Sequence, residues 1–196
     1  MSDPTFITGC ARSGTSLTTG VIGALGGKLG RVNSLNEINA VRDGIIKPYL
    51  QSMGCDRLGQ YPLADRENLK PYPDFRQRVL NAMAGAEFYK CAKLGPVWPL
   101  WAEHFPDSKY VIVRRHKADI VDSCHRAPFM RNHPDWNEWV DFHLECFEEM
   151  KASLDCIEVW PFKAIMGDLR DYEEMADFLG LPWNEDVVRR QINPGK

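Results

Sequence analysis

The residues of this chain best suited to chemistry lie in one loop, which reads GCARSGTS from Gly9 to Ser16. An apolar strand leads into the loop, and a helix rich in small residues follows it. Glycines let the backbone turn tightly, so that successive N–H groups point inward at the start of the helix, where the helix dipole adds partial positive charge. The loop predicts a site for phosphate or sulfate; the alternative is an ordinary glycine turn without a ligand.

This loop differs from the phosphate-binding loop of nucleotide triphosphatases, G-x-x-x-x-G-K-[ST]. Its glycines and its final serine match, but Thr15 occupies the lysine position and the cation of the loop is Arg12. Because that lysine holds the outer phosphates of ATP or GTP, its replacement disfavours a kinase or GTPase. A phosphatase with Cys10 as nucleophile is also disfavoured, since the arginine that such loops carry six positions later is Ser16 here.

A second charged stretch follows the apolar run from Lys109 to Val113 and begins with Arg114 and Arg115. A continuous β-branched run is typical of a buried parallel strand, and ligands gather at the carboxyl ends of such strands. The helix expected next carries Asp119 and Ser123. In a nucleotide triphosphatase a comparable strand ends in an acid that holds magnesium. Here the charge is reversed, which predicts a second anion and no metal.

Together the two stretches resemble the sulfotransferases that use 3′-phosphoadenosine 5′-phosphosulfate (PAPS) as donor. In that family the first loop is approximately G-x-x-[RK]-S-G-T-[ST] and holds the 5′-phosphosulfate, while R-[DN]-P-x-D-x-x-x-S holds the 3′-phosphate. Arg115, Asp119 and Ser123 lie at matching offsets, with His116 and Lys117 in place of the Asp/Asn and Pro. The resemblance implies PAPS and its product PAP as ligands, no metal, and a donor site made of Gly9, Ala11, Arg12, Ser13, Gly14, Thr15, Ser16, Arg115 and Ser123.

Four further segments extend the resemblance. The segments Tyr89–Lys93 and His104–Lys109 are similar to a lysine-ended strand and an F-P-D-A-K entry to the second motif. Near the end of the chain, Gly167–Leu169 and Asp177–Pro182 are similar to the E-D-L and F-L-G-L-P segments of the family. The resemblance thus extends over most of the chain, except approximately residues 39–86, which match no segment of the family.

Sulfuryl transfer needs a base for the acceptor hydroxyl and neutralised charge on the leaving phosphate. The histidine that small-molecule members carry in a K-[TS]-H segment is absent, because the chain reads Lys93-Leu94-Gly95 there. Other members use a glutamate some two dozen residues after the first loop, and Glu37 lies in that region. The resemblance therefore implies Glu37 as base and Arg12 at the leaving phosphate. The alternative is a solvated glutamate in the first turn of a helix.

Other residues carry less weight at this stage. Lys90 and Lys93 end a strand near the expected site, where lysines are commonly solvated. The aromatic residues Trp98, Trp101 and Phe129 are able to stack on an adenine or sugar ring, but large aromatic side chains are more often part of the core. The five histidines lack the spacing of a zinc site.

Composition is consistent with one compact enzyme domain over residues 1–196, because 44% of the residues are hydrophobic and nothing marks a second core. A net charge of −3 offers no basic field for nucleic acid. The sequence has no apolar run of membrane-spanning length and no signal peptide, so we expect a cytoplasmic protein without a membrane span. Six scattered cysteines without a C-x-x-C pair predict reduced thiols.

Strands that alternate with helices predict an α/β fold: three α/β/α layers with a central parallel sheet, in the P-loop-like architecture of sulfotransferases. The expected strands are Thr5–Thr8, Glu87–Cys91, Lys109–Val113 and Phe162–Met166. The expected helices are Thr15–Leu25, one near Glu37–Ser52, Asp74–Ala84, Val97–His104, Ala118–His125, Asp135–Ser153 and Asp171–Leu179.

The function expected from these motifs is transfer of a sulfuryl group from PAPS to a hydroxyl or amine, with release of PAP. The acceptor stays open among small molecules, carbohydrates and lipids, because residues 39–86 and 125–136, which would shape its pocket, lie outside the motifs. Two alternatives remain. One is a degenerate nucleotide or nucleoside kinase, and the other is a module that binds PAP or PAPS without turnover.

Overall fold

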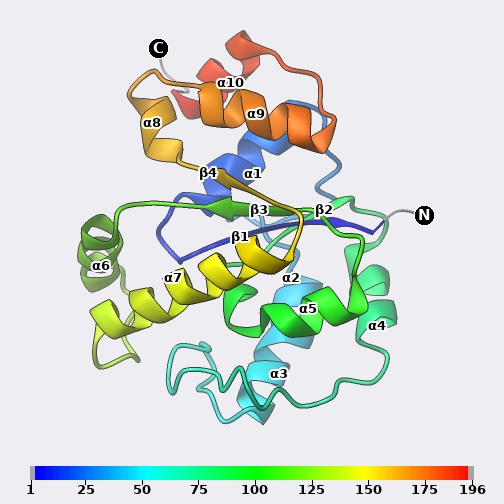
Figure 1. Cartoon of the computed structure of the whole chain (residues 1–196), viewed down its shortest axis with the longest axis vertical. Helices are drawn as coiled ribbons and strands as arrows, with labels where there is room; N and C mark the ends of the chain where they lie inside the picture. The colour runs from blue at the N-terminus through cyan, green and yellow to red at the C-terminus, as the bar shows by residue number, and fades with distance from the viewer. Residues whose placement is uncertain (1–2, 194–196) are drawn as a thin grey trace.

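The computed structural model describes residues 3–193 of the chain. Four parallel strands form the central sheet in the order β2-β1-β3-β4 (Figure 1). Helices cover both faces of this sheet, which confirms the predicted α/β class with three layers. The strands are β1 (Thr5–Gly9), β2 (Phe88–Lys90), β3 (Tyr110–Val113) and β4 (Cys156–Val159).

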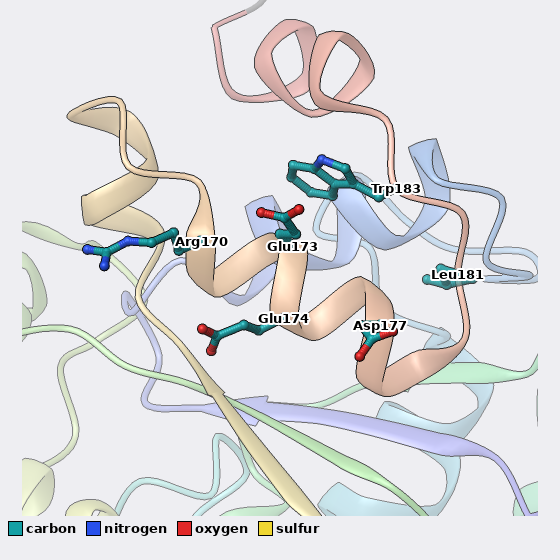
Figure 2. Close-up of a pocket in the computed structure, with 6 residues that line it drawn as sticks. All are labelled: Arg170, Glu173, Glu174, Asp177, Leu181 and Trp183. Carbon is teal, nitrogen blue, oxygen red and sulfur yellow. The ribbon is translucent and has the colours of Figure 1, made fainter.

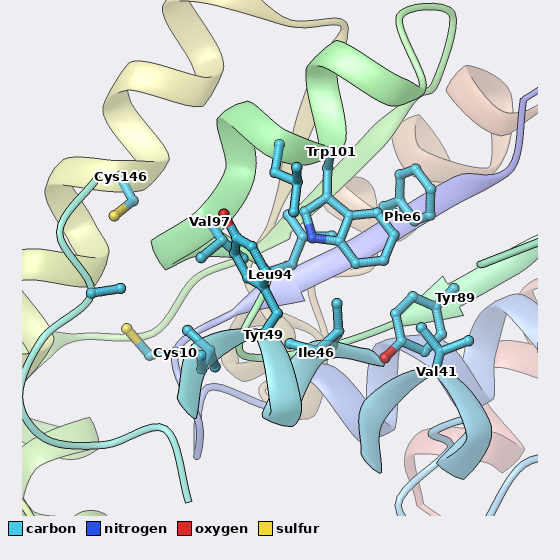
Figure 3. Packing of buried hydrophobic residues seen from close by; sticks show 14 of the residues in the cluster. Phe6, Cys10, Val41, Ile46, Tyr49, Tyr89, Leu94, Val97, Trp101 and Cys146 are labelled. Carbon is cyan, nitrogen blue, oxygen red and sulfur yellow. The ribbon is translucent and has the colours of Figure 1, made fainter. Parts of the chain in front are cut away.

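Neighbouring side chains of each central strand point to opposite faces and enter two separate cores. Phe6 packs with its ring centroid 4.7 Å from that of Trp101, in the larger core (Figure 3). Ile7 enters the smaller core on the other face. Because both faces are covered, the strands tolerate the continuous apolar runs seen in the sequence.

The larger core is covered by helices from the middle of the chain. They are α2 (Asn39–Val41), a π turn η1 (Arg42–Ile46), α3 (Lys47–Ser52), α4 (Phe75–Met83), the 3-10 turn η2 (Gly95–Val97), α5 (Trp98–His104), α6 (Lys117–Arg126) and α7 (Trp136–Ser153). The smaller core is covered by α1 (Thr15–Ala24), α8 (Pro161–Ile165), α9 (Arg170–Leu179) and α10 (Glu185–Ile192) (Figure 1).

One predicted element is wrong. The apolar residues from Phe162 to Met166 form the short helix α8 and not a strand. Pro161 occupies the start of this helix, where its missing N–H costs nothing. The last strand, β4, lies immediately before it and has a half-buried pattern with a charged residue, Glu158, so it lacks the apolar run of a central strand. Helix α10, which begins after the capping residue Asn184, was not predicted.

The other predicted elements are confirmed with ends that shift by a few residues. The helix expected near Glu37–Ser52 is continuous from Asn39 to Ser52 but contains the π turn η1. A π turn adds a residue to one helical turn and is frequent at functional sites. Among residues 3–193, no helix has both the length and the apolarity needed to cross a bilayer.

Candidate functional site

The strand order places the site between the carboxyl ends of β1 and β3. Strand β2 follows β1 in the chain and lies on one side of it, whereas β3 follows β2 and lies on the other side of β1. The strand order therefore reverses at β1. In open α/β sheets, ligands bind in the crevice where the strand order reverses. The two charged stretches of the sequence begin here, directly after Gly9 and after Val113.

The first loop has the backbone geometry of an anion site. Gly14 has a φ of 101° and precedes α1 without any side chain capping the helix, and Arg12 has a φ of 74°. The N–H of Thr18 bonds to the carbonyl of Gly14, which leaves the earlier N–H groups of α1 without an acceptor inside the helix. Ser13 is 3% exposed, and its Oγ has no hydrogen-bond partner among the described residues. These free donors are suited to a phosphate or sulfate group.

Gly9 is required by close packing of the loop against β3. A Cβ atom at this position would lie 2.5 Å from the carbonyl oxygen of Val113 and 2.7 Å from Ser13 Oγ. The glycine thus lets the loop approach the neighbouring strand.

The two charged stretches meet at this loop. Arg12 Nε donates a hydrogen bond of 2.9 Å to Ser123 Oγ on α6, and Arg115 Nη1 donates one of 2.9 Å to the carbonyl of Arg12. Arg115 Nε lies 3.9 Å from Asp119 Oδ2 and makes no hydrogen bond within residues 3–193. Residues that are more than 100 positions apart in the sequence therefore form one cationic cluster beside the start of α1.

Glu37 lies on the β2 side of the same loop and is buried. The segment before it crosses the start of α1, where the carbonyl of Leu35 accepts hydrogen bonds from Ser16 Oγ at 3.0 Å and Lys90 Nζ at 3.2 Å. Glu37 is 8% exposed, with Oε1 3.0 Å from Lys90 Nζ and Oε2 2.6 Å from Arg42 Nη1. The alternative of a solvated helix-start glutamate is therefore wrong.

The π turn supplies part of this ion cluster. Arg42 is its first residue and binds Glu37 with Nη1 while Nε and Nη2 contact the two carboxylate oxygens of Asp43. The hydrogen bonds from Arg42 lower the pKa of Asp43 to about 2, and Lys47 adds to this effect. Both carboxylate oxygens of Glu37 are therefore in contact with a cation, Oε1 with Lys90 and Oε2 with Arg42.

The expectation that Lys90 and Lys93 are solvated is wrong as well. Lys90 is 5% exposed and approaches Ser16 Oγ at 3.4 Å in addition to Glu37. Lys93 donates a hydrogen bond to the carbonyl of Leu58, and burial lowers its pKa below the ordinary value. A signal for both positions is present in the sequence, because each lysine ends or follows a short strand at the edge where ligands bind.

Cys10 is not suited to nucleophilic chemistry. It is 1% exposed, and burial raises the pKa of its thiol well above the ordinary range. A nucleophilic cysteine needs a lowered pKa and an accessible sulfur atom. The structure thus agrees with the rejection of a phosphatase. All six cysteines are free thiols.

A hollow of about 610 Å3 adjoins the cationic cluster on the β4 side. The ring of Phe162 lies 5.3 Å from the guanidinium carbon of Arg115. Pro161 packs against the loop, since a Cβ at Gly14 would be 3.1 Å from its Cγ. This region was not predicted from the sequence, because residues 162–166 were expected to form a strand. The hollow is lined by His116, Trp160, Phe162, Lys163, Met166 and Asp168.

A second hollow, of about 630 Å3, lies between α9 and the segment that leads to α10 (Figure 2). Three carboxylates line it, from Glu173, Glu174 and Asp177, together with Arg170 and Trp183. It belongs to the outer helical layer, away from the first loop. Its negative charge is also opposite to that of the cationic cluster, so it is not part of the candidate site.

No group of three His, Cys, Asp or Glu side chains able to hold a metal is found within residues 3–193.

No family model and no curated protein matches the sequence of this chain. Three solved structures of similar fold are sulfotransferases. A sulfotransferase domain from the curacin biosynthetic pathway has a TM-score of 0.57 at 14% identity, covering 95% of this chain and 77% of that one. Sulfotransferase STF1 from Mycobacterium tuberculosis has a TM-score of 0.52 at 13% identity, covering 100% and 72%.

Sulfotransferase STF9 from Mycobacterium avium has a TM-score of 0.57 at 12% identity, and the match covers 98% of this chain and 67% of that one. At such low identity the likeness concerns the fold. The chain has the fold of sulfotransferases, in agreement with the resemblance of its motifs.

Proposed function

We propose that this protein is a sulfotransferase that transfers the sulfuryl group of PAPS to a hydroxyl or amine and releases PAP. The observation that carries the proposal is the contact between Arg12, Ser123 and Arg115 beside the unpaired N–H groups of α1. A donor with phosphate groups at both its 5′ and 3′ ends needs two adjacent anion sites. The sulfotransferase fold supports the same conclusion.

In this proposal the donor is bound by the cationic cluster and the first loop. The N–H groups of the loop, Arg12 and the hydroxyls of Ser13, Thr15 and Ser16 bind the 5′-phosphosulfate. Arg115 and Ser123 bind the 3′-phosphate. The hollow beside Arg115 then takes the nucleoside, because its aromatic residues Trp160 and Phe162 suit a flat base.

The transfer itself is a direct displacement at sulfur. The acceptor oxygen forms a bond to sulfur while the bond from sulfur to the phosphate oxygen breaks, and the electron pair stays on PAP. Arg12 and the loop N–H groups stabilise the charge that develops on the leaving phosphate. Glu37 accepts the proton of the acceptor hydroxyl. To reach the carboxylate, this hydroxyl has to replace one of the two ion pairs that Glu37 makes with Lys90 and Arg42.

Calorimetric titration with PAP tests the donor site, with ATP and ADP plus magnesium as comparisons. We expect metal-independent PAP binding that weakens about 10-fold to 100-fold in Arg115→Ala, since a hydrogen bond to a charged group contributes about 1.5–3 kcal/mol. Arg126→Ala is the matched control, because Arg126 ends α6, the helix that follows Arg115, and is paired with the exposed side chain of Asp122. Magnesium-dependent ATP binding without PAP binding would favour the kinase.

A module that binds PAP without turnover is the second candidate function. The observation in its favour is that Glu37 is already held by two cations and the histidine of the K-[TS]-H segment is absent. Incubation with PAPS and a broad acceptor panel separates the two. Release of PAP that depends on an acceptor supports the enzyme, whereas PAP binding without any release supports the module.

A further inference from the structure

Helix α8 exposes its large apolar side chains and buries its small ones. It lies at the periphery of the molecule, between β4 and α9 (Figure 1). Phe162 and Ile165 are each 45% exposed, and Met166, directly after the helix, is 80% exposed. Pro161 and Ala164 are buried. Spacings of three and four residues place the three large side chains on one face. A helix that only covers a core has the opposite pattern, with its large apolar residues inside.

We call Phe162, Ile165 and Met166 the α8 patch. Single exposed apolar residues are common on protein surfaces, whereas a contiguous apolar patch with a polar rim marks a binding surface. The nucleoside of the proposed donor covers only part of the patch, because Phe162 and Met166 line the hollow and Ile165 does not. The α8 patch is therefore suited to a larger partner than a nucleoside.

The patch has a protrusion and a hollow side by side. Met166 is the most exposed large apolar residue within residues 3–193, and it stands at the rim of the hollow of about 610 Å3. Trp160 and Phe162 supply apolar walls to this hollow. The unbranched thioether of methionine adapts readily to such a space. A two-fold axis brings the protrusion of each copy to the hollow of the other, so a surface of this shape fits its own copy.

The charges beside the patch also suit a second copy. Lys163 Nζ lies 3.1 Å from Asp171 Oδ1, and Arg170 Nη2 lies 2.7 Å from Asp168 Oδ2. These two cations at the rim are thus balanced by two carboxylates of the same chain. In a two-fold interface a surface faces itself, so an excess of one sign would repel the partner. A strongly basic or acidic partner would instead need a surplus of the opposite charge.

We propose that the α8 patch binds a second copy of this chain, with Met166 of each copy inserted into the hollow of the other. The contact is the same on both copies, and the assembly closes as a dimer. This dimer does not depend on the proposed function. One consequence does rest on it: the nucleoside of the donor and Met166 of the partner need the same hollow, so donor binding favours the monomer.

Sedimentation equilibrium of the whole chain over about 1–200 μM tests the dimer. We expect reversible dimers with a Kd of about 10 μM, because the patch is small. Met166→Asp should weaken association about 10-fold to 100-fold, since it places an unpaired charge in an apolar contact. A wild-type chain that stays monomeric over this range overturns the proposal. Assemblies that keep growing with concentration also overturn it, because a two-fold contact closes.

Two variants separate the patch from a general loss of solubility or folding. Met166→Leu keeps an apolar protrusion and should keep the dimer. Tyr61→Asp is the matched control, because Tyr61 is 48% exposed but lies outside the α8 patch. Melting temperatures in dilute solution, where every variant is monomeric, check that each one folds. A dimer that survives Met166→Asp, or one that Tyr61→Asp weakens equally, contradicts the proposed surface.

Addition of PAP tests whether Met166 occupies the hollow. At about ten times its own Kd, PAP should raise the dissociation constant of the dimer about 100-fold, because both copies gain the ligand on dissociation. PAP binding that leaves the dimer unchanged would overturn the insertion of Met166. If calorimetry shows no PAP binding, the proposed function fails, and the dimer with its loss in Met166→Asp still decides this inference.

Discussion

The donor side and the acceptor side of the candidate site are built in different ways. The proposed 5′-phosphosulfate part of the donor side consists largely of backbone, since the loop from Gly9 to Ser16 presents its N–H groups through local turns, while Arg115 and Ser123 join it from a second motif. The proposed acceptor side around Glu37 consists of side chains from separate segments, because Lys90 and Arg42 hold Glu37. A loop suited to one anion is thus encoded in a short stretch, whereas the surroundings of Glu37 depend on the whole fold.

The two sides also differ in how completely their polar groups are paired. On the donor side, Ser13 Oγ and Arg115 Nε have no hydrogen-bond partner within residues 3–193. On the acceptor side, Glu37 is paired with two cations. A donor anion would satisfy groups that are otherwise unpaired. In the proposed reaction the acceptor has to displace an existing ion pair, so we expect turnover to be more sensitive than donor binding to changes around Glu37.

Glu37→Gln gives the largest expected difference between the two sides. Turnover should fall about 1,000-fold, because proton transfer by a positioned base contributes about 100-fold to 10,000-fold. PAP affinity should stay within about twofold, since Glu37 lies outside the proposed donor site. Steady-state kinetics and calorimetry measure both quantities. Glu87→Gln, which alters an exposed pair with Lys28, is the control, and an active Glu37→Gln enzyme would exclude Glu37 as the base.

Gly9→Ala tests whether the donor side depends on backbone packing. The added Cβ meets the carbonyl of Val113 at 2.5 Å, so we expect a loss of about 2–3 kcal/mol in the free energy of unfolding. Gly44→Ala in the π turn is the matched control. A Cβ there has no heavy atom within 4 Å, and alanine should stabilise the helix by up to about 1 kcal/mol. Equal urea midpoints for the two variants would show that the loop does not depend on close packing at Gly9.

The acid stability of the Arg42 cluster is the smallest expected effect. The pKa of Asp43 is lowered to about 2 in the folded state, so its contribution to stability is complete above about pH 4 and disappears as the pH falls towards 2. Because Asp43 is partly exposed, the effect should be below about 1 kcal/mol. Melting temperatures at pH 7, 4 and 2.5 test this. The difference in melting temperature between wild type and Asp43→Asn should become smaller as the pH falls. A difference that grows at low pH would contradict the lowered pKa of Asp43.

The fold was largely predictable because its central strands are buried on both faces. Strand β3 is a continuous apolar run, and β1 is buried from Phe6 to Gly9, as a position between two helical layers requires. The edge strand β4 escaped prediction because it is only half buried and includes Glu158. Helix α8 was mistaken for a strand because Phe162 and Met166 are apolar, although both are exposed.

The candidate site was predictable to different extents on its two sides. The proposed donor residues follow from two motifs, and the structure brings Arg12, Arg115 and Ser123 together as the motifs suggest; their roles stay predictions. The burial of Lys90 and Lys93 was not predicted, because a lysine at a strand end is solvated or paired according to what packs over it. For Phe129 the sequence left stacking on a ligand ring open beside the more common position in the core, and the structure shows the side chain exposed.

The sequence by itself determined the features that depend on neighbouring residues: the turn at Gly14, the start of α1 and the apolar strands that aim the loop. Positive φ angles and helix dipoles arise within a few residues, so short motifs are sufficient to specify them. Only the tertiary structure decided which charges are paired and which rings are exposed. Glu37 with Lys90, and Phe129 with Gln60, are more than 50 positions apart, and their burial is set by elements that no local pattern describes.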